Sequence, residues 1–123
     1  MNKSNIKINE DKQYQDVYAT YTINIVPDVL KNSLFIKLED EDDDLGDYKI
    51  SHILVNSIPV FIQKYNCHNT NEFSIFVDHI KCAENNEDIF NISEQLITAL
   101  KLDKSNIVWK NEKLQDLMNS SKV

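Results

Sequence analysis

The chain has 123 residues and a formal net charge of −7, from 20 acidic residues against 13 basic ones. This length suits one domain, and a hydrophobic fraction of 41% supports one core without disulfides or metals. Every basic residue is a lysine and Gly46 is the single glycine. Bidentate arginine contacts and glycine-rich phosphate loops are therefore excluded, and direct nucleic-acid binding is not expected.

Residues 1–12 are polar, and we expect a flexible N-terminal segment there, followed by a single domain over residues 13–123. The segment lacks the apolar run of a signal peptide, and no window reaches the roughly 18 apolar residues of a membrane span. We therefore expect a cytoplasmic protein with no membrane contact, whose two cysteines, Cys67 and Cys82, stay reduced.

The first strand is expected over residues 14–26, because apolar and polar residues alternate there. Val17, Ala19, Tyr21, Ile23 and Ile25 would share one face, and Tyr18, Thr20, Thr22 and Asn24 the other. Pro27 ends this strand and suits the start of a helical turn. The same alternation predicts strands over residues 33–39, 48–55, 58–65 and 72–81. Pro59 would place the fourth strand at a sheet edge, or the pairing of that strand would start after Pro59.

Two helices are expected to follow. Asn91 and Glu94 resemble a capping box for a helix that runs to about Leu102. Asp103 or Ser105 would cap a second helix with the apolar face Ile107, Leu114, Leu117 and Met118. Whether residues 107–109 are helix or strand is left open. The sequence thus predicts an α+β fold of about five mostly antiparallel strands with two C-terminal helices on one face.

The negative charge is concentrated in one segment, expected to be a loop between the second and third strands. Its seven acids leave 13 acidic residues against 13 lysines elsewhere: Glu39, Asp40, Glu41, Asp42, Asp43, Asp44 and Asp47. One interpretation is a solvated loop that keeps the protein soluble. Another is a negatively charged surface that attracts a basic partner by electrostatic steering. Calcium does not fit, because an EF-hand loop begun at Asp40 would place Leu45 and Ser51 at its glycine and glutamate positions.

No catalytic, metal or cofactor site is expected. Ser51 and His52 are neighbours on a strand and point to opposite faces. Cys67-His68 and the pair His79 and Cys82 would lie roughly 30 Å apart along the strand between them, too far for one zinc ion. Tyr14 and Tyr18 lie on the face expected to be exposed, and an exposed tyrosine pair is a plausible interface anchor.

In its size, acidic run EDEDDDLGD, lysine- and asparagine-rich composition and lack of catalytic motifs, the chain resembles the small acidic immunity proteins of bacterial contact-dependent inhibition and related toxin systems. This class-level resemblance implies a heterodimer with a cognate cationic toxin domain, often a nuclease. Three alternatives are a phage-encoded nucleic-acid mimic, a secretion chaperone or adaptor that binds along a sheet edge, and an enzyme with a dispersed site.

Overall fold

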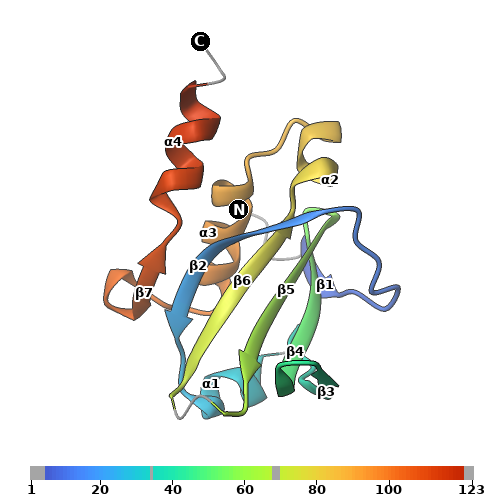
Figure 1. The fold of residues 1–123 in the computed structure, drawn as a ribbon, viewed down its shortest axis with the longest axis vertical. Coiled ribbons are helices and arrows are strands. Elements are labelled where there is room, and N and C mark those ends of the chain that lie inside the picture. The colour runs from blue at the N-terminus through green and yellow to red at the C-terminus, as the bar shows by residue number, and fades with distance from the viewer. Residues whose placement is uncertain (1–4, 34, 68–69, 121–123) are drawn as a thin grey trace.

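The structure is a computed structural model that describes residues 5–33, 35–67 and 70–120. Over these ranges the chain is α+β, as predicted, but it has seven strands and four helices rather than five and two (Figure 1). The strands are β1 (Ile6–Ile8), β2 (Val17–Asn24), β3 (Glu39–Asp43), β4 (Gly46–Val55), β5 (Ile58–Tyr65), β6 (Glu72–Asp78) and β7 (Ile107–Lys110). The helices are α1 (Pro27–Asn32), α2 (His79–Glu84), α3 (Ile89–Ala99) and α4 (Glu112–Ser120).

The strands form one antiparallel sheet in the order β1-β4-β5-β6-β2-β7. Strand β3 lies off this path and pairs with residues 46–50 of β4, whereas β1 pairs with residues 53–55. Because β5 occupies the other edge of β4, β1 and β3 share one edge, end to end. The strand expected at Pro59 is β5, which lies inside the sheet between β4 and β6, so an edge position is wrong. Its pairing with β6 does start after Pro59, at Val60.

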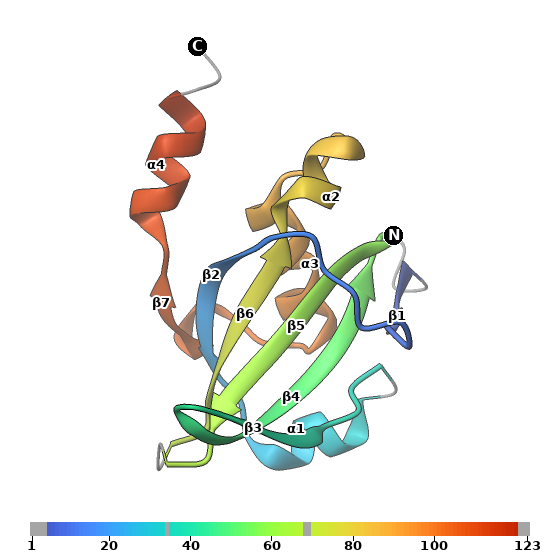
Figure 2. The ribbon, with the colours of Figure 1, turned by 45° about the vertical axis from the view of Figure 1, so that its right-hand side comes forward.

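The core lies between the sheet and α3, which contacts β2, β4 and β6. Ile53, Val60, Ile75 and Leu96 are fully buried there. Burying each such side chain stabilises the fold by roughly 1.5–3 kcal/mol relative to exposure. The opposite face of the sheet carries no helix within the described chain; the segment before β2 and the strand β3 cross in front of it (Figure 2). We call this the open sheet face.

Element boundaries depart from the prediction where a side chain caps the backbone. The strand expected over residues 72–81 stops at Asp78, whose carboxylate accepts the Lys81 N–H and starts α2. Helix α3 begins after Asp88 rather than Asn91, because Asp88 accepts the Phe90 N–H. The helix therefore starts early enough to bury Ile89 in the core. Residues 107–109, left open by the sequence, belong to strand β7.

Two predicted segments are wrong in their secondary structure. Of the described residues between 33 and 39, Glu39 alone is in a strand; Leu34 lies outside the described residues. The backbone turns instead, because the Ile36 N–H bonds to the Ser33 carbonyl and the Lys37 N–H bonds to Ser51 Oγ. At the N-terminus, β1 lies within the range expected to be flexible and pairs with β4.

A β-bulge in β2 changes which side chains reach the core. The register shifts between Ala19, opposite Phe76, and Tyr21, opposite Ile75. The extra residue, Thr20, is fully buried. Since a one-residue shift exchanges the two faces, Val17 and Ala19 lie on the open sheet face, not with Tyr21 in the core as predicted. Among the described helices, none has the length and apolar character needed to cross a membrane.

Candidate partner-binding surface

The acidic run forms a β-hairpin rather than the expected loop. Strand β3 pairs with the start of β4, with Asp43 opposite Gly46 and Glu41 opposite Tyr48. The turn suits its residues, because Gly46 has a φ of +125° and the Leu45 N–H bonds to Asp43 Oδ1 at 2.8 Å. Aspartate has a low propensity for β-strands, so β3 depends on the unpaired edge that β4 offers. The charges therefore have fixed positions.

The strand alternation divides the β3 carboxylates between two sides. Glu39, Glu41 and Asp43 point to the open sheet face; Tyr48 donates to Glu41 Oε1 at 3.2 Å and Tyr65 to Asp43 Oδ2 at 2.7 Å. On the other side Asp40 lies opposite Lys49 and forms a 2.7 Å ion pair with it. The two sides of the hairpin therefore differ in their neighbours, since the tyrosine hydroxyls donate on the open side and Lys49 pairs with Asp40 on the other.

The two tyrosines form a cross-strand pair on β4 and β5, with ring centroids 5.4 Å apart in an edge-to-face arrangement. The hydrogen bond to Asp43 raises the pKa of Tyr65 to about 12. Partial burial, with the neighbouring Glu41 carboxylate, raises the pKa of Tyr48. Both hydroxyls thus stay protonated at neutral pH and act as donors that orient the carboxylates.

Aromatic side chains continue along the open sheet face from this pair. Phe61 on β5 stacks on Phe76 of β6, with centroids 4.7 Å apart and planes at 15°. Tyr14, in the segment before β2, packs edge-on against Phe61 at 5.2 Å, and its hydroxyl lies 2.7 Å from His52 Nδ1. These side chains are half-buried, which leaves part of each ring in contact with solvent. The result is an aromatic surface with an acidic hairpin at one end.

Tyr14 and Tyr18 do not form the exposed pair that the sequence predicted. Tyr14 lies half-buried on the open sheet face. Tyr18 precedes the bulge and lies opposite Val77, a core residue, so it faces the helix-bearing side. Tyr18 is 39% exposed and its ring stacks on His79 at 4.1 Å, while His79 Nε2 lies 2.7 Å from an Asp16 oxygen. The bulge at Thr20, which the alternation did not reveal, puts Tyr18 on the same side as Tyr21, whereas Tyr14 lies before β2 begins and follows no strand alternation.

One group of side chains near the hairpin has the chemistry of a cation site. Glu39, Glu41 and His52 place ligand atoms within 4.8 Å of one another. Lys12 already supplies a positive charge there, since its Nζ lies 2.7 Å from Glu39 Oε1 and this hydrogen bond lowers the pKa of Glu39. Burial lowers the pKa of His52, so its ring is neutral at pH 7. The ion pair between Lys12 and Glu39 thus connects the N-terminal segment to the hairpin.

The other candidates for chemistry do not come together. Ser51 is buried and accepts the Lys37 N–H, while His52 lies on the open sheet face, so the two cannot form a dyad. Cys82 is buried, which raises the pKa of its thiol to about 12. Cys67 is exposed, and its neighbour His68 lies outside the described residues.

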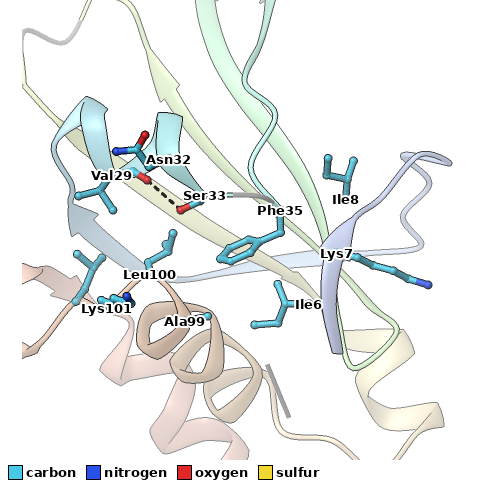
Figure 3. A pocket seen from close by; sticks show the side chains of 11 residues that line it. Ile6, Lys7, Ile8, Val29, Asn32, Ser33, Phe35, Ala99, Leu100 and Lys101 are labelled. Carbon is cyan, nitrogen blue, oxygen red and sulfur yellow. Dashed lines mark hydrogen bonds between the residues drawn. The ribbon is translucent and has the colours of Figure 1, made fainter. Parts of the chain in front are cut away.

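An apolar hollow of about 810 Å³ lies between β1, α1 and the end of α3 (Figure 3). Ile6, Phe35, Ala99 and Leu100 border it, and the Lys7 side chain points away from it. Its described lining includes no histidine, cysteine or carboxylate. The hollow therefore lacks the groups of a hydrolytic or metal site.

Comparisons of the chain with models of protein families, with curated proteins and with solved structures found no match.

Proposed function

We propose that this protein is a cytoplasmic inhibitor of the immunity-protein type, which neutralises a cognate cationic toxin domain, most simply a nuclease, by direct complex formation. The observation that carries the proposal is the β3–β4 hairpin, where seven of the 20 acidic residues are gathered at one edge of the sheet. A toxin surface that holds RNA or DNA is basic and matches this charge. Binding there would block the access of RNA or DNA to the toxin.

The contact involves the seven hairpin acids, with Tyr14 on the same open sheet face. Tyr18, which the sequence grouped with them, lies on the helix-bearing side and is left out of the contact. Clustered charge raises the rate of association with an oppositely charged partner, and the rate falls with ionic strength. Six of the seven acids are exposed, and Glu39 is half-buried beside Lys12. No enzymatic step, metal or cofactor is part of this mechanism.

The direct test uses the cognate toxin domain, which the proposal expects a neighbouring gene to encode. Stopped-flow association is measured at several salt concentrations for the native protein and for a variant with all seven acids replaced by Asn or Gln. Association should slow by at least about tenfold at low salt, and its salt dependence should flatten. Glu112→Gln with Asp116→Asn, on the exposed side of α4, is the control. An unchanged rate in the seven-acid variant would reject the proposal.

A second candidate, a chaperone or adaptor that binds an extended segment, is favoured by strand β7. This strand pairs with β2 and ends the order of the sheet, while Val108 is 49% and Trp109 45% exposed. An extended peptide adds a strand to such an edge through backbone hydrogen bonds. Binding of a hydrophobic dye that Trp109→Ala abolishes would favour this function, whereas unchanged dye fluorescence would count against it.

A further inference from the structure

The two sides of strand β3 offer different electrostatic environments to a partner. Asp40 is paired with Lys49, and Lys49 lies opposite Lys64 on β5, so this side already contains positive charge. Glu41 and Asp43, on the open sheet face, form no ion pair with any described lysine. Lys12, which reaches that face, bonds to Glu39. Each side of the hairpin therefore has two carboxylates without a lysine partner among the described residues, Glu41 and Asp43 on the open sheet face and Asp42 and Asp47 on the other side. The first pair lies next to the aromatic surface.

Hydrogen bonds orient the carboxylates of Glu41 and Asp43, and this orientation suits them to bind a cation. Each accepts one tyrosyl hydrogen bond, and Asp43 also accepts the Leu45 N–H, whereas a carboxylate has about four lone-pair sites. Acceptor positions therefore remain for a guanidinium or an ammonium group. The rings of Tyr48 and Tyr65 lie beside them, and an aromatic face attracts a cation within about 6 Å. Because the groups are already oriented, little conformational entropy is lost on binding.

Resting on the proposed function, we propose that the partner docks on the open sheet face, with one of its arginine or lysine side chains seated between Glu41 and Asp43 against Tyr48 and Tyr65. The stacked rings of Phe61 and Phe76 continue the surface toward β6. Aromatic residues at the centre of a contact, with charges at its rim, are the usual composition of a protein interface. The partner therefore presents a cation next to apolar side chains.

The test compares two double variants that remove the same charge from opposite sides of one strand. Glu41→Gln with Asp43→Asn changes the open side, and Asp40→Asn with Asp42→Asn changes the lysine side. Long-range steering is equal in both, because the net charge is equal. The dissociation rate of the toxin complex should rise by about tenfold or more in the first variant and by less than about threefold in the second.

A peptide probe gives the same test without the toxin. An acetylated Arg-Ile-Arg-Ile-Arg peptide is titrated into the ¹⁵N-labelled full chain, with a Glu-Ile-Glu-Ile-Glu peptide as control. Chemical shifts should change at Tyr48, Tyr65, Phe61 and Phe76, and the first double variant should abolish these changes. Glu41→Gln alone, which keeps an acceptor for Tyr48, is used if the double variant has lost its native circular dichroism.

The outcomes separate this proposal from the function on which it rests. Equal acceleration of dissociation in the two double variants, or peptide shifts centred on Asp40 and Asp42, would overturn the docking face but leave the charge-based inhibitor intact. Absence of peptide binding would also overturn it. Unchanged toxin binding in the seven-acid variant would reject both.

Discussion

Tyr65 on β5 donates a 2.7 Å hydrogen bond to Asp43 on β3, although the two strands are not neighbours in the sheet. Strand β4 lies between them, and its Tyr48 packs edge-on against the Tyr65 ring. The bond thus joins the tip of the acidic hairpin to the interior of the sheet. It keeps the Asp43 carboxylate over the open sheet face.

This bond predicts an unusual tyrosine titration. The pKa of Tyr65, raised to about 12 by Asp43, exceeds its ordinary value of 10.0. Since the folded value is the higher one, the bond stabilises the fold fully below pH 10, and this contribution is lost as pH rises toward about 12. Burial also raises the pKa of Tyr14 and of Tyr21, so several tyrosines ionise late. Ultraviolet difference titration of Tyr65→Phe should therefore lose one transition near pH 12 and keep the others. Asp43→Asn should move this transition back toward 10, and an unmoved titration would contradict the assignment.

His52 predicts a loss of stability in mild acid. Burial lowers its pKa below the ordinary 6.5, so the neutral ring is favoured in the folded chain. The stabilisation is present above pH 6.5 and is lost as pH falls through the folded value. Urea unfolding between pH 7 and 5 should show a decline that is smaller in His52→Gln. An NMR titration of the imidazole nitrogens measures the pKa directly, and a value above 6.5 would refute the prediction.

The bulge in β2 predicts a coupled pair of buried hydroxyls. Thr20 Oγ1 lies 2.6 Å from Ser93 Oγ on α3, and both residues are fully buried. Thr20→Val leaves a buried hydroxyl with one partner fewer and should cost about 1–2 kcal/mol. Ser93→Ala should cost a similar amount, and the double variant less than the sum of the two. Urea denaturation of the four proteins measures the coupling, and strict additivity would show that the contact contributes nothing.

Strand β1 predicts that the N-terminal segment contributes to stability. Ile6 packs against the core, and the buried Asn9 accepts the N–H groups of Asp11 and Lys12. Deletion of residues 1–8 removes a strand from the edge of β4 and should lower the melting temperature by several degrees. Deletion of residues 1–4 is the control, and equal melting temperatures for the longer deletion and the full chain would show that this strand adds no stability.

The sequence pattern alone was sufficient to predict those elements whose bounds depend on neighbouring residues in the chain. Strand β5 has the predicted bounds, residues 58–65, because alternating side chains and a tight turn at Asn56-Ser57 define it without help from distant residues. Pro27 begins α1 for the same reason, since its fixed φ suits a helix start. The gathering of seven acids in residues 39–47 is a property of the sequence itself.

Tertiary structure alone decided the position and direction of those charges. Residues 39–43 have poor strand propensity, and they form β3 because β4 presents an unpaired edge. The bulge at Thr20, which puts Tyr18 on the helix-bearing side, accompanies the pairing with β6 and the buried contact with α3. Such pairings join residues that are distant in sequence, so the alternation of apolar and polar residues within one segment cannot predict them. The acidic run identified a charged segment, and the sheet determined which carboxylates face the aromatic surface.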